Sequence, residues 1–515
     1  MDPITNIIKI NNNNGKNMTI GTIISLSVYF IVMLGIGLYA FKTTSQDSSG
    51  YLLGGRKLGP AVTALSAGAS DMSGWMVMGL PGAMYLTGLS NIWIGVSLIV
   101  GAYINYLIVA PRLRVYTELA NDSITLPEFF ENRFEDKTRL LKIISSIVII
   151  VFFTVYTSSG VVGGGKLFES SFGLSYELGL YVTAGVVVIY TLFGGFLAVS
   201  MTDFVQGCIM FVALVLVPVV VLIEFDGYLT IHETIKALDT EKFNLISNTG
   251  ILGIISALGW GLGYFGQPHI IVRFMAIRSV KDLKVARRIG MTWMVIALIG
   301  AMATGFFGIA YVSKNNLVLN DAETIFVLLS QVLFHPLIGG FLLAAILAAI
   351  MSTVSSQLLV TSSSLTEDVY KSFFRKSASE KELVLVGRIC VAAVALAAIG
   401  LAHNRDSSIL QLVSNAWAGF GSAFGPLIVF GLYWKRMTFL GALAGIIIGA
   451  TTVLIWIYAP ISIGGQSLSN IVYEIVPGFV LSSLAIVVVS LSGKKPSAET
   501  KAMFDTMLRK LKEQS

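Results

Sequence analysis

The chain has 515 residues, of which 55% are hydrophobic and only 12% are charged. Because soluble domains carry roughly 25% charged residues, this composition excludes an ordinary soluble protein and indicates one embedded in a lipid bilayer. The 35 Lys and Arg against 29 Asp and Glu leave a net charge of +6. We assign this excess to loop ends near anionic lipid rather than to nucleic-acid binding.

Apolar stretches, each long enough to cross the bilayer as a helix, recur along the chain, and we count about thirteen of them. Short connections join them, so we expect one transmembrane domain over residues 19–492, with a polar tail at 1–18 and a charged tail at 493–515 that forms a solvated helix or a flexible segment. The approximate limits of the spans are 19–41, 60–87, 90–110, 143–165, 178–198, 204–223, 250–272, 289–312, 335–364, 384–401, 408–432, 438–459 and 470–492.

The basic residues divide unevenly between the loops of the two sides. An odd number of spans puts the two ends on opposite sides, and the positive-inside rule then places the N-terminus outside and the C-terminus in the cytoplasm. We therefore expect a multi-pass protein of the plasma membrane, which is the inner membrane in a bacterium.

The second span contains an aspartate within the stretch AGASDMSGW. Asp71 is the only acidic residue that we place deep within a span. A charge near the middle of a bilayer is costly and usually faces a cavity, an ion or a partner. The neighbouring glycines and serines favour an interruption of the helix, which would free carbonyl oxygens to bind a cation. The alternative role is a carboxylate that caps a helix or pairs with a hydroxyl.

A second interruption is expected five spans later, where residues 258–268 read LGWGLGYFGQP. Many transporters consist of inverted repeats whose broken helices meet at the bilayer midplane. Because five is odd, spans 2–6 would repeat upside down as spans 7–11, with span 1 before the pair and spans 12 and 13 after it. Glycine is also common in membrane helices for packing alone.

The ninth span is rich in hydroxyl groups, with the sequence AAIMSTVSSQLLVTSSS over residues 348–364. Ser352, Ser355 and Ser356 share one helical face, and Thr353 lies beside it. Hard cations such as sodium bind several neutral oxygens at once, so this face is a candidate sodium site. Hydroxyls that bond back to their own helix are the alternative.

At these residues the sequence resembles the sodium:solute symporter family. Four stretches carry the resemblance, which runs over nearly the whole chain: GASDMSGW, FTVYTSSG, GWGLGYFGQPHI and MSTVSSQLL. It implies an all-α polytopic membrane protein with the LeuT-type fold of two inverted five-helix repeats, in which helices 2 and 7 are broken. It also implies a secondary active symporter that works by alternating access and is no enzyme.

The resemblance implies a sodium site built from backbone carbonyls and hydroxyls. Asp71 matches an acidic position tied to sodium use, where its negative field would support cation binding. The implied ligands are the carbonyls of Ala69, Met72 and Ala349 and the hydroxyls of Ser352 and Thr353.

The members most similar at these stretches imply L-proline as the co-transported substrate. A small, rigid ring can be enclosed by flat aromatic walls at little entropic cost. Arg56 and Asp203 match further functional positions, expected on the cytoplasmic release side. The implied substrate positions are Tyr156, Trp260, Tyr264 and Pro268, with Ser73, Gly74 and Trp75 close by.

Alternatives remain at this stage. Pantothenate, another amino acid or a sugar is possible as the solute, and a channel could use the same oxygens as a filter, although the breaks occur singly rather than as a repeated pore motif. GVVGGGKL at 160–167 resembles a phosphate-binding loop, but Leu167 replaces the required Ser or Thr. We expect sodium as the co-transported ion, although a proton could replace it if Asp71 titrates. We expect no organic cofactor, no nucleic acid and no obligatory protein partner.

Overall fold

The computed structural model describes residues 19–43, 48–246 and 250–514. This part of the chain is almost entirely helical, apart from one hairpin in which β1 (Ser462–Ile463) pairs antiparallel with β2 (Gln466–Ser467), Ser462 opposite Ser467. Helices dominate because a bilayer offers no water to satisfy an open backbone.

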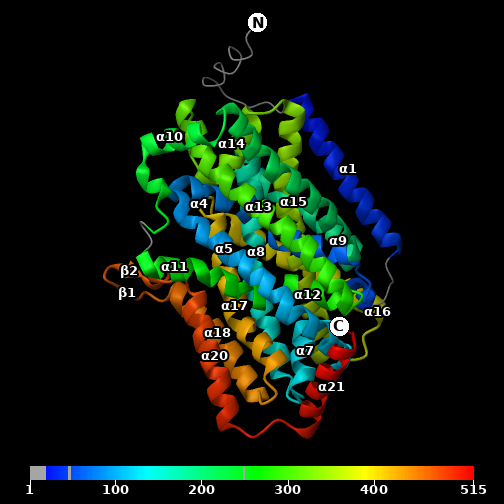
Figure 1. Cartoon of the computed structure of the whole chain (residues 1–515). Helices are drawn as coiled ribbons and strands as arrows, with labels where there is room; N and C mark the ends of the chain where they lie inside the picture. Colours follow the sequence, from blue (N-terminus) through cyan, green and yellow to red (C-terminus); the bar gives the residue numbers. More distant parts are fainter. Residues whose placement is uncertain (1–18, 44–47, 247–249, 515) are drawn as a thin grey trace.

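The elements follow one another in the order shown in Figure 1. Those of the first half are α1 (Ile20–Thr43), α2 (Ser48–Leu53), η3 (Gly54–Arg56), α3 (Pro60–Asp71), η4 (Trp75–Gly79), α4 (Leu80–Thr87), η5 (Gly88–Asn91), α5 (Ile92–Ile104), η6 (Asn105–Val109), α6 (Ala110–Leu119), α7 (Leu126–Arg133), α8 (Leu140–Phe172), α9 (Tyr176–Glu224), α10 (Tyr228–Leu238) and η7 (Thr240–Phe243). Those of the second half are α11 (Gly250–Gly259), η8 (Trp260–Gly266), α12 (Pro268–Ala276), α13 (Val280–Lys314), η9 (Ala322–Thr324), α14 (Ile325–Val332), α15 (Pro336–Ser363), η10 (Ser364–Phe374), α16 (Glu380–Ala402), α17 (Ile409–Tyr433), α18 (Phe439–Tyr458), α19 (Leu468–Ile471), α20 (Ile475–Ser492) and α21 (Ala498–Gln514).

Ten helical stretches within the described residues are long and apolar enough to cross a membrane, and three shorter apolar helices accompany them. The expected number of thirteen is therefore not confirmed by helix length. The difference has two sources. The predicted spans 60–87 and 90–110 fall in one apolar helical stretch, Trp75–Leu119, and the predicted spans 178–198 and 250–272 correspond to the shorter apolar helices Tyr176–Ile189 and Gly250–Gly266.

Helix α15 lies at the centre of the bundle, packed against α1, α8 and α9. Its most apolar window is 83% buried, whereas that of α1 is only 22% buried. Large apolar side chains of α1, such as Ile20 and Ile31, are 78% and 68% exposed. Because exposed apolar side chains are favourable only in lipid, α1 forms the periphery and α15 the interior.

Both predicted helix interruptions are present. In the first, α3 ends at Asp71, and the backbone of Met72 turns to φ −84° and ψ 78° before η4 begins. In the second, α11 gives way to the 3₁₀ segment η8, and Gln267 is extended before Pro268 starts α12. Proline suits that first helical position because its missing N–H would be unpaired there anyway.

Helix α9 has a sharp kink at Gly195, whose φ of 59° and ψ of −163° are non-helical. Glycine adopts this backbone conformation without a steric penalty. Asp203 follows the kink within the same helix and has no exposed surface. The interpretation of Asp71 as the only acidic residue deep within a span is therefore wrong, because the predicted gap between two spans at Asp203 is helix interior.

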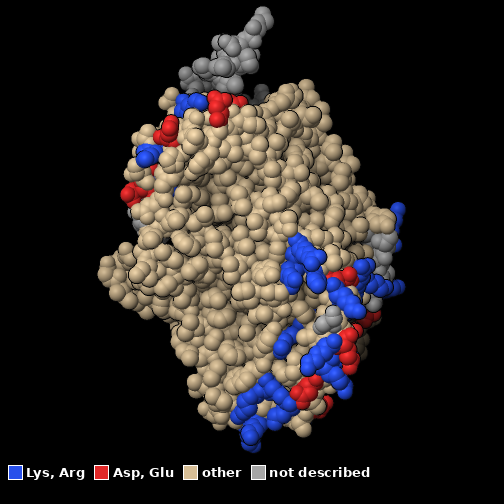
Figure 2. Space-filling view, in the orientation of Figure 1, with Lys and Arg blue, Asp and Glu red and all other residues tan. Residues whose placement is uncertain are grey.

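Charged side chains gather at the two ends of the molecule. Figure 2 shows a few beside α10 and a much larger group of Lys and Arg at the opposite end, where α7 and α21 lie, with a broad uncharged surface between them. Helix α21, in the charged tail, packs against α6 and buries Phe504 and Met507. The tail is thus a docked helix rather than a fully solvated one.

Candidate functional site

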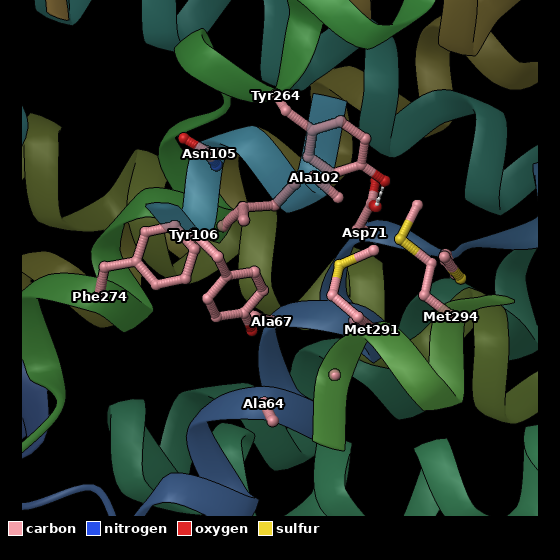
Figure 3. A pocket seen from close by; sticks show the side chains of 14 residues that line it. Ala64, Ala67, Asp71, Ala102, Asn105, Tyr106, Tyr264, Phe274, Met291 and Met294 are labelled. Carbon is pink, nitrogen blue, oxygen red and sulfur yellow. Dashed lines mark hydrogen bonds between the residues drawn. The ribbon is translucent and has the colours of Figure 1, made fainter. Parts of the chain in front are cut away.

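Asp71 forms hydrogen bonds with residues of both broken segments. Its carboxyl Oδ2 accepts a hydrogen bond of 2.5 Å from the Tyr264 hydroxyl in η8 (Figure 3). Its backbone carbonyl, freed by the end of α3, accepts bonds from the Trp75 indole at 3.0 Å and the Tyr156 hydroxyl at 3.2 Å. The carboxyl is 2% exposed, and its Oδ1 has no hydrogen-bond partner among the described residues. The site therefore holds a buried acceptor that is only partly satisfied.

Four of the five expected sodium ligands lie together where the first break meets α15. The Ser352 hydroxyl donates to the carbonyls of Ala69 and Ala349 at 2.7 and 3.2 Å. The Thr353 hydroxyl lies 3.3 and 3.2 Å from the same two carbonyls. All four residues are buried. If the two hydroxyl protons rotated away from the carbonyls, all four oxygens would have lone pairs available to a cation, and a hard cation prefers this donor set.

The fifth expected ligand, Met72, lies at the break itself. It is buried, and its N–H donates to the Gly68 carbonyl at 2.9 Å. None of its hydrogen bonds within the described residues joins it to Ser352 or Thr353. The carboxyl of Asp71 likewise points to Tyr264 rather than to these hydroxyls, so its influence on a cation there would act through its field.

The expected substrate residues form an aromatic wall across the two breaks. The ring of Trp260 lies 6.4 Å from that of Trp75, measured between centroids. Tyr264 meets Trp417 edge-on at 5.1 Å, and the Trp417 indole donates to the Trp260 carbonyl at 2.8 Å. Tyr156 reaches the same place through its bond to Asp71. Aromatic walls of this kind enclose flat or cyclic solutes.

Three further expected positions lie at different distances from this wall. The Ser73 hydroxyl accepts a hydrogen bond of 3.4 Å from the backbone N–H of Trp75. A Cβ on Gly74 would lie 3.5 Å from the Ile350 side chain, at ordinary van der Waals distance, so the first break lies beside α15. Pro268 instead lines a separate cavity with Thr125 and other residues of α7, α15 and η10. The structure does not bring Pro268 together with the aromatic wall.

A small cavity lies beside Asp71, between α3, α5, α12 and α13 (Figure 3). Met291, Met294 and Phe274 make most of its lining apolar. The cavity has a volume of about 30 Å³, enough for one or two waters but too small for an amino acid.

Arg56 and Asp203, expected together on the release side, lie in different environments. The Arg56 guanidinium binds the Asp122 carboxyl at 2.8 Å and the Met275 and Ser123 carbonyls, each at 2.8 Å. Burial lowers the pKa of Arg56, and the nearby Asp122 charge opposes this shift. Arg56 thus ties the segment before α3 to the end of α12.

Asp203 belongs to a fully buried network that sequence reasoning missed. Its Oδ2 lies 3.1 Å from the Arg273 guanidinium, which also donates to the Ser66 and Ser356 hydroxyls. Arg273 follows the predicted end of the seventh span by one residue, so the sequence alone predicts a loop residue there. The signal that could have identified it is a basic residue five positions after the interrupted stretch 258–268. The network joins α3, α9, α12 and α15.

The model of the sodium:solute symporter family matches residues 51–449. This chain belongs to that family. The symporter is 58% identical to the osmoregulated proline transporter OpuE of Bacillus subtilis, over 96% of this chain and 99% of that protein. It is 58% identical to the high-affinity proline transporter PutP of the same organism, over 92% of this chain and 98% of that protein. The sodium/proline symporter of Staphylococcus aureus is 56% identical over 93% of this chain and 94% of its own.

Solved structures support the fold of the symporter. A Na⁺-coupled sialic acid symporter in a substrate-bound outward-open state matches 93% of this chain and 100% of its own, with a TM-score of 0.78 at 21% identity. The nucleobase-cation transporter Mhp1 matches with a TM-score of 0.52 at 12% identity, over 89% and 98% of the two chains. At such identities the likeness shows the fold alone.

Proposed function

We propose that this symporter couples inward movement of sodium to uptake of L-proline across the plasma membrane, by alternating access. The observation that carries the proposal is the meeting of the Ala69 and Ala349 carbonyls with the hydroxyls of Ser352 and Thr353 at a broken helix. Proline is supported by relatives named as proline transporters at 56–58% identity.

The proposed sodium site consists of these four residues and Met72, supported by the field of Asp71. Substrate would bind against Trp260, Tyr264, Tyr156 and Trp75, with Ser73 and Gly74 at the first break. Both ligands would then share one region, because Asp71 contacts Tyr264 directly and lies two residues after Ala69. Pro268 is proposed to act from its own cavity, on the path between the site and one face.

The proposed membrane topology has thirteen passes within residues 19–492, of which passes 2–6 and 7–11 are inverted repeats. Passes 2 and 7 are the two broken segments, and α9 would supply passes 5 and 6 on either side of its kink at Gly195. The concentration of Lys and Arg around α21 (Figure 2) supports a cytoplasmic C-terminus and an external N-terminus.

One sodium ion per solute molecule supplies enough free energy to accumulate the solute against a steep gradient. A potential of about 100 mV contributes roughly 2.3 kcal/mol per charge, and a tenfold sodium gradient adds about 1.4 kcal/mol. Together these support roughly 500-fold accumulation. No organic cofactor and no obligatory protein partner enter this scheme.

Uptake of labelled proline into membrane vesicles tests the proposal. We expect accumulation that requires an inward sodium gradient, competes with unlabelled proline and is insensitive to excess pantothenate or glucose. Uptake that persists without sodium would overturn the coupling, and sodium-driven uptake of pantothenate or a sugar in place of proline would overturn the substrate.

A further inference from the structure

Tyr473 lies between α19 and α20, far along the chain from either break. It is 7% exposed, and its ring stacks on that of Trp260, with centroids 5.2 Å apart and planes inclined by 27°. Within the described residues, this is the closest of the ring contacts of Trp260, since Trp75 and Trp417 lie at 6.4 Å. Tyr473 therefore covers one part of the tryptophan that we place against the substrate.

Both ends of Tyr473 are fixed by hydrogen bonds to different helices. Its backbone N–H donates to the Ser256 hydroxyl in α11 at 2.9 Å. Its phenol hydroxyl donates to the Ser414 carbonyl in α17 at 2.7 Å. A tyrosine held at both ends cannot rotate away from Trp260 without losing one of these bonds, so its ring acts as a fixed surface.

The helices around Tyr473 leave little freedom for Trp260 to adopt another position. A Cβ on the preceding Gly259 would come within 2.9 Å of Ile475 and Val476 at the start of α20. The Trp260 carbonyl is held by the Trp417 indole at 2.8 Å. The backbone of Trp260 is thus fixed by α17 and α20, and its ring by Tyr473.

Tyr473 lies outside the part of the chain that the family model matches, which ends at residue 449. In the proposed topology it also lies outside the inverted repeats, at the start of the last pass. A residue that reaches the site from outside the proposed repeats can change without disturbing the proposed sodium ligands, which lie within them.

We propose that Tyr473 is a specificity-determining residue, which positions the Trp260 ring and thereby selects the cyclic amino acid that the site accepts. This inference rests on the proposed transport of proline. The chemistry is a stack of two flat rings, whose orientation fixes the width of the space left for a third, saturated ring. Hydroxyproline, with one added hydroxyl, is the solute most sensitive to that width.

The test compares Tyr473→Leu and Tyr473→Phe with the parent protein, at matched surface abundance. Loss of the stacked ring in Tyr473→Leu should raise the KM for proline roughly 3- to 10-fold and change the ratio of proline to hydroxyproline affinity. Half-saturating sodium should stay within about twofold. Tyr473→Phe keeps the ring and should restore most of the proline affinity and the parent selectivity.

Tyr458→Leu is the matched control. This tyrosine ends α18, which packs against α20, and it is 69% exposed. It should change neither KM nor selectivity. Equal effects of Tyr458→Leu and Tyr473→Leu, or an equal loss of sodium and proline affinity in Tyr473→Leu, would overturn the inference. If the parent protein accumulates no proline, the proposed function itself has failed, which is a distinct result.

Discussion

Both breaks interrupt a membrane helix, but the side chains around the two interruptions differ. The first spans Met72–Gly74 and follows a buried carboxyl, and the carbonyl of Ala69 one turn earlier meets two hydroxyls of α15. The second is the seven-residue segment η8, which contains no charged residue. Its glycines at 261 and 266 pack directly against backbone atoms of Ser97 and Phe420, so that the aromatic residues between them turn inward.

This difference shows how one region can hold two unlike ligands. A small cation requires oxygens at short range and a negative field, which the first break supplies. An organic ring requires shaped apolar surface, which the second break supplies. The Tyr264–Asp71 hydrogen bond is the direct link between the two, so binding of either ligand would affect the other.

The largest expected effect follows from removing the buried Arg273–Asp203 ion pair, which belongs to the network that joins α3, α9, α12 and α15. Arg273→Met leaves the Asp203 carboxyl buried and unpaired, and a loss of about 3–5 kcal/mol in the free energy of unfolding is typical of such a change. Thermal unfolding in detergent would show it as a lowered Tm. The double variant Asp203→Leu/Arg273→Met should lose far less than Arg273→Met alone.

The control for this pair is Arg278→Met, which breaks an exposed pair with Asp282 in which the arginine is 60% exposed. Exposed pairs contribute little to stability because water screens them, so the Tm should hardly move. Equal shifts in the two single variants would contradict the view that the buried network stabilises the packing of α3, α9, α12 and α15.

The next-largest effect is expected at the second break, where the substrate would bind. Trp260→Ala removes a ring wall, which should cost on the order of 1–3 kcal/mol of proline binding, roughly ten- to a hundredfold in affinity. Sodium binding without substrate should survive, because the four clustered oxygens come from the first break and α15. Sodium and proline binding to the purified protein can be measured separately. Loss of sodium binding with unchanged proline affinity would contradict the placement of the substrate at the second break.

Asp71→Asn tests the charge at the first break. The substitution nearly preserves shape, and the amide can still interact with the Tyr264 hydroxyl, but the negative field is lost. We expect half-saturating sodium for proline uptake to rise about tenfold, equivalent to roughly 1.4 kcal/mol. Tyr264→Phe, which keeps the charge and removes the hydroxyl, should shift sodium dependence less. Unchanged sodium dependence at normal abundance would contradict a role of the carboxyl.

The smallest effects are expected from single hydroxyls of the sodium cluster. Ser352→Ala and Thr353→Val each remove one oxygen with little change of volume, at about 1 kcal/mol per lost interaction, so half-saturating sodium should rise about fivefold in each. Ser363→Ala is the control, because that hydroxyl bonds back to the Leu359 carbonyl of its own helix at 2.7 Å. A similar shift in the control would indicate general helix packing instead.

Composition and local motifs were enough to predict the class of protein, the two interruptions and most residues around them. Polar and flexible residues within an apolar span have few explanations in a bilayer, so Asp71 and the segment at 258–268 stand out without a structure. The hydroxyl face of residues 352–356 was visible for the same reason, and four of the five expected sodium ligands do lie together.

Which distant groups meet depends on how the helices pack, and this could not be predicted from local motifs. The pairing of Asp203 with Arg273 depends on how α9 packs on α12, and no local pattern encodes that contact. Pro268 stands next to the second break in sequence, but the turn at Gln267 directs it into a different cavity. Tyr473 reaches Trp260 across 213 positions because α20 packs on η8 and α17. Such contacts arise from the packing of helices, whose faces are set by the whole bundle rather than by their own residues.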